Sequence, residues 1–180
     1  ALAQLQIEIT RGVDNPTPIA VVPFGWSGPG ASPEDVARII DSDLARSGQF
    51  SPVSRRDMLS YPTRGSDLYF RDWRAINSDY VLIGRYELAA AGNLKLSWQL
   101  FDSTREHSVQ DGVVTGKASE VRMLAHKIAD EVYETLTGIP GAFATRLLYV
   151  SVTRNPSGKD FYRLTLADSD GARPIALLET

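Results

Sequence analysis

Ser27 has the surroundings that most resemble a catalytic motif. It stands in a Gly-Trp-Ser-Gly stretch at residues 25–28, between an apolar run and a helical pattern, as in the nucleophile elbow of a hydrolase. Pro29 takes the place of the motif's last glycine, and the predicted helix begins too late to lie beneath the serine. A phosphate loop fits no better, because the Gly-Lys-Ser/Thr ending is absent and Glu34 and Asp35 would repel an anion. We therefore predict a structural loop, with a serine hydrolase using Ser27 as an alternative.

Two aromatic residues, Phe24 and Trp26, belong to the same loop. Large apolar side chains beside a sheet edge are mostly found packed on a core. We predict that these two plug the core over the sheet edge, and an exposed recognition patch is the second interpretation.

Histidines and carboxylates offer no catalytic or metal-binding pattern. His107 and His126 are the only histidines, no cysteine is present, and no His-x-x-x-His spacing occurs. By helical spacing His126 lies near Arg122 and Asp130, and we predict a surface or boundary position for it. The carboxylates are predicted at caps, turns and exposed helix positions, so no acid/base pair can be assigned. We predict no catalytic residue, no cofactor and no metal ligand.

The most regular pattern in the chain lies at its amino end. Residues 4–10 alternate polar and apolar without a break, with Leu5, Ile7 and Ile9 as the apolar members. This period of two predicts a strand with one solvent-exposed face and one apolar face. Residues 12–18 then have the composition of a turn and linker. Such a strand can pair with its own sheet, as a permanent edge strand, or add to the sheet of another protein.

The first part of the remaining chain predicts a strand, a helix and a second strand. Residues 19–22 form an apolar, β-branched run that Pro23 ends. Ser32 is the predicted N-cap of a helix with Pro33 at its first position. Its apolar stripe is Val36, Ile39, Ile40 and Leu44, and Gly48 ends it. A short strand is predicted at residues 50–53.

The pattern continues as an α/β domain. Short helices are predicted after the Ser54 cap and over 68–76, and strands over 79–84, 94–101 and 108–115. Ser119 is the predicted cap of a long helix that ends at Gly138. Parallel pairing through a right-handed crossover follows from the strand–helix–strand order. The fold class is therefore α/β, with helices covering a mixed β-sheet in three layers across residues 19–141.

The last part of the chain is rich in strand patterns. Residues 146–153 and 161–167 are joined by a loop at 155–160 and predict a hairpin, and 175–178 predicts a third strand. Three strands with an apolar face are marginal alone. We expect that this chain is cut from a larger protein.

Composition excludes several classes of function. The chain has 180 residues, of which 43% are apolar and 23% charged, as in ordinary globular proteins. A formal net charge of −3 and scattered basic residues disfavour nucleic acid and anionic membranes as partners. No run reaches the roughly 18 apolar residues needed to span a bilayer. The opening residues 1–3, Ala-Leu-Ala, are of the type left at a signal-peptide cleavage site.

Several short blocks of residues follow one another in an order that is typical of one protein family. The most specific blocks are 18–24, Trp26, 28–30, 33–35, 43–44, 47–48, 81–84, 136–139, 141–143 and 145–146. Together they resemble the TolB family of the Tol–Pal envelope system. Residues 168–171 resemble that family's first-blade turn, where an aromatic residue is commoner than Ser169.

The resemblance implies a fold and a function. TolB-like proteins pair an N-terminal α/β domain, similar to anticodon-binding domains, with a six-bladed β-propeller. Residues 142–180 would then be the first-blade fragment, and residues 1–3 a signal-peptide remnant. The family acts in the periplasm of Gram-negative bacteria, without catalysis, in envelope integrity, cell division, colicin uptake and protein transport.

The resemblance also implies the partners. The family's N-terminal segment binds the C-terminal domain of TolA, and its propeller binds the lipoprotein Pal. Residues 4–18 are therefore the predicted partner-binding strand and linker, and the alternatives are the Ser27 hydrolase and a nucleic-acid-binding α/β module. The predicted binding residues are Gln4, Leu5, Gln6, Ile7, Glu8, Ile9, Thr10, Gly12, Val13 and Asp14.

Overall fold

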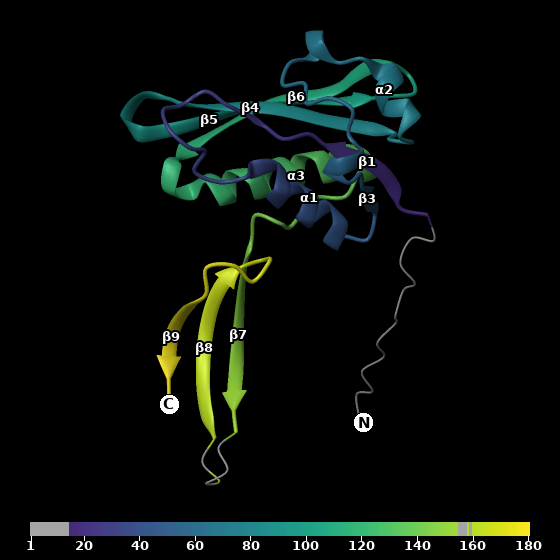
Figure 1. Cartoon of the computed structure of the whole chain (residues 1–180). Helices are drawn as coiled ribbons and strands as arrows, with labels where there is room; N and C mark the ends of the chain where they lie inside the picture. The colour runs from purple at the N-terminus through teal and green to yellow at the C-terminus, as the bar shows by residue number, and fades with distance from the viewer. Residues whose placement is uncertain (1–14, 155–157, 159) are drawn as a thin grey trace.

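The structure contains two separate β-sheets, one covered by helices and one formed by the last three strands (Figure 1). It is a computed structural model that describes residues 15–154, 158 and 160–180. We call the first sheet the main sheet and the second the tail sheet. The predicted mixed sheet with helices is confirmed.

The main sheet has the strand order β3-β1-β4-β5-β6, and β2 pairs with β4 beyond the end of β1. β1 runs parallel to both β3 and β4, which confirms the predicted parallel pairing. β4, β5 and β6 form an antiparallel meander. The strands are β1 (Thr17–Val21), β2 (Gly25–Trp26), β3 (Phe50–Pro52), β4 (Tyr80–Leu88), β5 (Asn93–Asp102) and β6 (His107–Lys117).

Helices lie on both faces of the main sheet. α1 (Val36–Arg46) and α3 (Val121–Thr137) cover one face, and α2 (Phe70–Ala75) lies on the other (Figure 1). The α2 side also carries short 3₁₀ turns, and its core includes Met58 and Trp73. Two of these turns are Arg55–Asp57 and Gly65–Asp67; two further 3₁₀ turns lie elsewhere, Ala90–Gly92 between β4 and β5 and Ala118–Glu120 directly before α3. No helix among the described residues is long and apolar enough to cross a membrane.

The larger core lies between the main sheet and the α1–α3 layer. Trp98 is 1% exposed in the middle of β5, opposite Gly84 on β4 and Gly112 on β6. A Cβ atom on Gly112 would lie 2.6 Å from the indole, and one on Gly84 would lie 2.3 Å from the Phe24 ring. The two glycines therefore make room for large aromatic side chains on this face.

The aromatic loop after β1 packs as predicted. Phe24 and Trp26 are partly buried against the larger core. The Trp26 ring centroid lies 4.9 Å from that of Tyr86 on β4, and its indole N–H donates to the Gly30 carbonyl at 3.2 Å. Core packing over the sheet edge is therefore confirmed. The pairing of β2 with β4 was not predicted, because two residues carry no detectable strand period.

Of the three predicted N-caps, Ser54 is confirmed, because its side chain accepts the Arg56 N–H at the start of the 3₁₀ turn, whereas Ser32 and Ser119 are wrong. α1 begins at Val36, and its cap is Asp35, whose carboxylate accepts the Arg38 N–H at 3.1 Å. The Ser32 hydroxyl is instead engaged with the Tyr86 hydroxyl and the Glu34 carbonyl.

The start of α3 differs in the same way. A 3₁₀ turn at Ala118–Glu120 precedes the helix, and its N-cap position is held by Glu120, without a side-chain cap. Ser119 lies inside that turn. The predicted ends of the two helices are confirmed. Gly48 after α1 and Gly138 after α3 both have positive φ values, of 72° and 74°.

The tail sheet consists of β7 (Arg146–Thr153), β8 (Phe161–Asp168) and β9 (Ile175–Glu179), all antiparallel. The three predicted strands are confirmed. Residues 155–157 and 159 of the predicted hairpin loop lie outside the described residues. The tail sheet meets the α1–α3 layer at the end where β7 begins and β8 ends (Figure 1).

Candidate functional site: a polar joint between the α1–α3 layer and the tail sheet

The predicted partner-binding residues, from Gln4 to Asp14, lie outside the described residues. Their role therefore stays a prediction. The structure instead draws attention to a set of buried charged residues that sequence reasoning missed.

The geometry around Ser27 does not form a nucleophile elbow. Ser27 is exposed, directly after β2, and α1 begins only at Val36. In the described part of the chain, no hydrogen bond joins the Ser27 hydroxyl to a histidine. His107 is exposed at the start of β6, and His126 is bonded to Asp43. The hydrolase alternative therefore gains no structural support.

His126 is fully buried, and the prediction of a surface or boundary position is wrong. Its side chain is 0% exposed, and its Nδ1 atom lies 2.5 Å from Oδ2 of Asp43, which is 1% exposed. His126 recurs with Ala129 and Tyr133 at spacings of three and four, next to the predicted apolar stripe of α3. Helix α1 packs against this second stripe and buries it.

Asp43 likewise contradicts the prediction that the carboxylates lie at caps, turns and exposed positions. It sits on the buried face of α1, and its second carboxylate oxygen, Oδ1, accepts from Arg46 at 2.8 Å. A buried carboxylate is stable only when charged or donor groups satisfy its oxygens. His126 and Arg46 supply these partners from two different helices.

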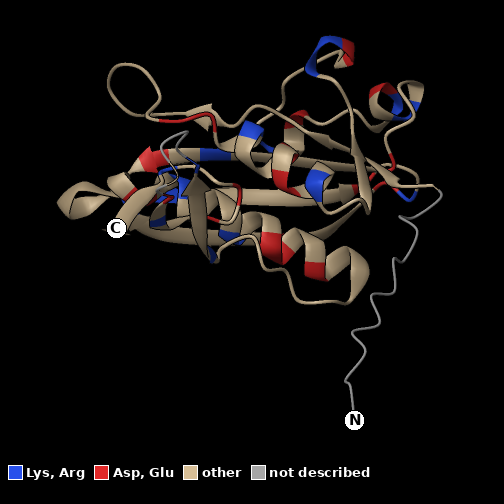
Figure 2. Cartoon of the chain, turned by 90° about the horizontal axis from the view of Figure 1, so that it is seen from below, with Lys and Arg blue, Asp and Glu red and all other residues tan. Residues whose placement is uncertain are grey.

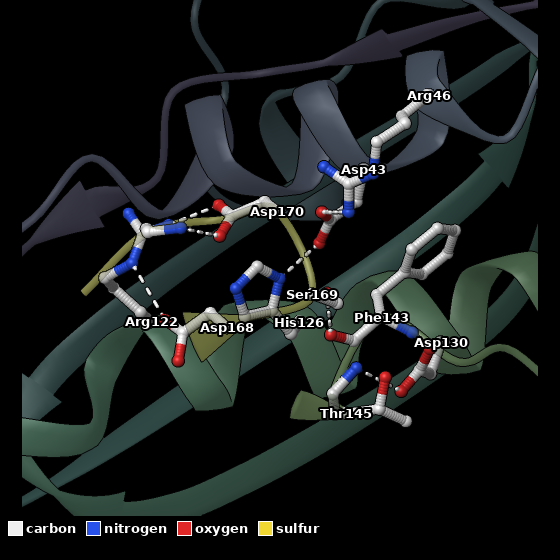
Figure 3. A network of polar contacts seen from close by, with 12 residues as sticks. Asp43, Arg46, Arg122, His126, Asp130, Phe143, Thr145, Asp168, Ser169 and Asp170 are labelled. Carbon is white, nitrogen blue, oxygen red and sulfur yellow. Dashed lines mark hydrogen bonds and ion pairs between the residues drawn. The ribbon is translucent and has the colours of Figure 1, made fainter. Parts of the chain in front are cut away.

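Arg122 connects α3 to the turn after β8. Its guanidinium pairs with Asp170 and lies 3.5 Å from Asp168, although these residues are 48 and 46 positions away, respectively (Figure 3). Asp168 is only 5% exposed and also accepts two bonds from Arg173, at 2.9 and 3.1 Å. This turn is therefore attached to the helix layer through charges.

The linker into β7 is held by a second set of polar contacts. The Asp130 carboxylate of α3 accepts the backbone N–H groups of Phe143 and Ala144, at 2.6 and 3.0 Å. The Ser169 hydroxyl donates to the Phe143 carbonyl at 2.6 Å, which ties the turn after β8 to the linker. The Phe143 ring also packs edge-on against Tyr133, with centroids 5.6 Å apart. We call this whole set the polar joint; its members are Asp43, Arg46, Arg122, His126, Asp130, Phe143, Ala144, Asp168, Ser169, Asp170 and Arg173.

The electrostatics of the polar joint favour the ionised form of Asp170. The largest influence on the pKa of Asp170 is burial, which raises it. The Ala172 N–H and the nearby Arg122 and His126 outweigh burial, so that the pKa of Asp170 lies below its usual range. A ring nitrogen of His126 and one oxygen each of Asp168 and Asp170 lie within 4.8 Å of one another, a distance at which an ion could bind. However, Arg122 and Arg173 already neutralise both carboxylates.

The fold and the joint define a class of protein: an α/β domain joined to a three-stranded antiparallel sheet through a charged connection. Comparison with known proteins then gives the family. The chain belongs to the TolB family, because the family model for the TolB amino-terminal domain matches residues 5–109.

Curated relatives agree over nearly the whole chain. The chain is 47% identical over 181 residues to the Tol-Pal system protein TolB of Thioalkalivibrio sulfidiphilus, and this match covers 100% of the chain and 41% of that protein. It is 44% identical over 174 residues to the same protein of Pseudomonas fluorescens, covering 97% of this chain and 40% of the relative. The chain therefore spans about two fifths of the length of these relatives.

A solved structure supports the same assignment. The crystal structure of TolB from Acinetobacter baumannii matches with a TM-score of 0.76 and 31% identity. The match covers 98% of this chain and 42% of the solved chain.

Proposed function

We propose that this chain is the amino-terminal part of a non-enzymatic periplasmic adaptor of the Tol–Pal system. It binds TolA through residues 4–14, and the longer protein binds Pal through a propeller that begins in the tail sheet. The observation that supports this best is the 47% identity, over the full chain, to a Tol-Pal system protein.

The amino-terminal alternation supports reversible binding to a sheet edge. Covering three aliphatic side chains is worth roughly 1.5–3 kcal/mol each, and each new ladder bond about 1 kcal/mol. Ordering the backbone costs roughly 1–2 kcal/mol per residue. The two contributions nearly cancel, which suits a contact that is made and released repeatedly. Pairing of this strand with its own domain would compete with partner binding.

The exposed faces of the tail sheet support the propeller proposal. Leu148, Val150 and Val152 of β7 share a face with their β8 partners Leu166, Leu164 and Tyr162. Val150 is 58% exposed and Leu178, opposite Leu164 on β9, is 59% exposed. The other face also carries apolar residues, including Leu147 and Tyr149. A propeller blade packs against a neighbour on both sides, which would cover both faces.

The charge distribution does not favour the nucleic-acid alternative. Positions of Lys and Arg are interspersed with those of Asp and Glu along the ribbon in Figure 2, and no continuous basic stripe can be followed among the described residues. A nucleic-acid site usually needs such a stripe to contact phosphates.

Deleting residues 4–14 tests the proposal directly. We expect the deletion to abolish binding to the purified TolA C-terminal domain, measured by calorimetry, because the added strand is the binding element. Ile7→Asp should weaken binding at least tenfold, since it places a charge on the apolar face. Gln6→Ala, on the opposite face, is the matched control and should change the affinity less than twofold. Unchanged affinity after the deletion would refute the proposal.

A further inference from the structure

Half of the α2-side face of the main sheet is not covered by the helix on that side. α2 lies over the end of the sheet where β4 begins, and its Phe70 ring packs edge-on against Phe101 of β5 (Figure 1). The core on this side reaches along β4 only as far as Ile83. Beyond Ile83, every second side chain of β4, β5 and β6 points to the same face, and Arg85 and Lys95 are exposed there. This half of the face is therefore accessible to a binding partner.

The strand register places Ser97 of β5 at the centre of this open half. Arg85 is opposite Ser97 on β4, and Val113 is opposite it on β6. Lys95 and Gln99 lie two residues away along β5 and share the same face. Opposite side chains in an antiparallel pair have Cβ atoms roughly 5 Å apart, and diagonal neighbours roughly 7–8 Å apart. Two cationic side chains therefore stand next to one hydroxyl group.

The open half of the face is hollowed around Ser97. A groove of about 320 Å³ lies over β4, β5 and β6, and the loop before α2 forms one wall. That wall is fixed to the floor, because the Gly65 N–H donates to the Gln99 side-chain oxygen at 3.1 Å. We call this hollow the polar groove, and its lining includes Thr63, Arg85, Lys95, Ser97, Asp111 and Val113.

The charges that line the polar groove are two positive and one negative. They belong to Arg85, Lys95 and Asp111. In the described part of the chain, no ion pair joins any of these three side chains to another residue. Glu87 is opposite Lys95 in the register, but it does not line the groove. The position beside the Ser97 hydroxyl, which can donate a hydrogen bond, therefore favours an anionic group.

The openness of the groove determines what kind of anion fits. Exposed ion pairs contribute little by themselves and are screened by salt, so a small anion would bind weakly. Additional contacts are available along the groove. Val113 is 56% exposed and offers apolar surface, and the Asp111 carboxylate can accept from a donor. An extended peptide presents a side chain to such a surface at every second residue, so one segment can use all of these contacts.

We propose that the polar groove is a docking surface for an extended acidic segment of a partner protein. A carboxylate of that segment is held by Arg85, Lys95 and the Ser97 hydroxyl, and a neighbouring apolar side chain packs against Val113. The contact weakens as the salt concentration rises. The groove lies outside residues 4–14 and outside the tail sheet, so its failure would leave the proposed function untouched.

A titration followed by NMR tests the docking surface on the whole chain. The probe is an acetylated and amidated peptide of alternating glutamate and valine. We expect its addition to shift the amide signals of residues 83–87, 95–99 and 111–115, and the affinity to fall as NaCl is added. The same peptide with glutamine in place of glutamate should not shift them. Equal shifts with both peptides, shifts confined to other residues, or no shifts at all would overturn the proposal.

Two sets of substitutions test the residues of the groove. Arg85→Gln with Lys95→Gln should weaken binding of the glutamate peptide by about tenfold. Arg38→Gln with Lys127→Gln makes the same charge change at exposed positions of α1 and α3, and should alter the affinity less than about twofold. Equal losses would show a general attraction by charge and would overturn the proposal.

A variant that fills the groove separates its shape from its charge. Ser97→Tyr keeps both cations and places a ring over the floor, so we expect it to abolish binding of the glutamate peptide. Unchanged affinity would place the peptide elsewhere and would overturn the proposal. If Ser97→Tyr does not fold, the paired charge substitutions decide.

Other occupants of the groove are outcomes of the same measurements. Sodium glutamate and inorganic phosphate should bind much more weakly than the peptide. An affinity equal to that of the peptide would make the groove a small-anion site and would overturn the proposal. Sedimentation equilibrium should show no self-association that the Arg85→Gln and Lys95→Gln pair removes. Such an association would identify a second copy of the chain as the occupant instead.

Discussion

The charged residues of the polar joint show how much a single side chain depends on its partners. Asp43 and His126 are both buried, and each satisfies the other across two helices. A buried charge that loses its partner is left without water or a counter-ion. The stability of this fold should therefore depend strongly on the contact between Asp43 and His126, although this contact does not belong to the apolar core.

Removing Asp43 should destabilise the fold substantially. We expect Asp43→Ala to lower the free energy of unfolding by about 3 kcal/mol or more, because His126 and Arg46 lose their partner in a buried site. Urea denaturation measures this. Asp41→Ala on the same helix is the control. Burial raises the pKa of Asp41, so losing that carboxylate should cost little. Equal losses for the two variants would contradict this account.

Asp35 makes the stability of the chain sensitive to acid. Two hydrogen bonds from the Arg55 guanidinium, at 2.6 and 2.8 Å, are the main cause that lowers the pKa of Asp35. A lowered pKa in the folded state stabilises the fold above the unfolded pKa, and this contribution is lost as the pH falls through the folded pKa. Both side chains are partly exposed, so the effect is modest.

The Asp35→Asn variant isolates this ion pair, because asparagine is an equally good N-cap. We expect the wild-type chain to be more stable than the variant at neutral pH, by the urea midpoint, and the difference to vanish in acid. A difference that persists in acid would assign the effect to capping instead of charge.

At the scale of whole elements, glycines decide how closely the strands and aromatic side chains approach. Gly112 on β6 leaves room for the buried indole of Trp98, which is a rigid ring with no alternative space. We expect Gly112→Ala to destabilise the fold by about 1–3 kcal/mol, because overpacking displaces the indole. The urea midpoint, followed by tryptophan fluorescence, measures the change.

The matched control for that change lies on the same strand. Thr115 of β6 is exposed, and Thr115→Ala should alter the free energy of unfolding by less than about 0.5–1 kcal/mol. Similar destabilisation by both substitutions would indicate a strand-propensity effect, and the packing explanation would fail.

At the scale of the whole molecule, the polar joint determines how firmly the tail sheet is attached. The joint is built mainly from ion pairs and backbone hydrogen bonds, and only Phe143 adds an aromatic contact to α3. Polar connections of this kind can open without unfolding either side.

Arg122→Gln should open this connection locally. We expect faster amide exchange at residues 168–172 and at Ala144, since the turn loses its attachment to α3, while β4 and β5 keep their protection. Arg38→Gln, on an exposed position of α1, should leave all of these rates unchanged. Unaltered exchange at residues 168–172 in Arg122→Gln would show that the turn is held by other contacts.

Much of the element content could be predicted from the sequence. The runs at β1, β4, β5 and β6, the apolar stripes of α1 and α3, and the tail hairpin all follow from local periods that one stretch of chain carries by itself. The glycines that end α1 and α3, Gly48 and Gly138, can be predicted in the same way, because the left-handed backbone at a helix end is a local requirement.

The polar joint could not be predicted, although its parts were visible. Arg122 and His126 were placed correctly on one helix, and residues 168–171 were recognised as a turn. Nothing in either stretch indicates that they meet, because 46 residues separate Arg122 from Asp168. The error at the Ser32 cap has the same origin, since Tyr86 engages Ser32 from a distant strand.

The amino-acid sequence by itself determined the family, the mixed α/β class and the order of the elements. Apolar period, turn residues and matched blocks are properties of neighbouring positions, and they need no knowledge of the fold. The tertiary structure alone decided which polar residues are buried and which charges pair. Burial is a property of what packs against a residue, and for His126 that is α1 and a turn from a later part of the chain.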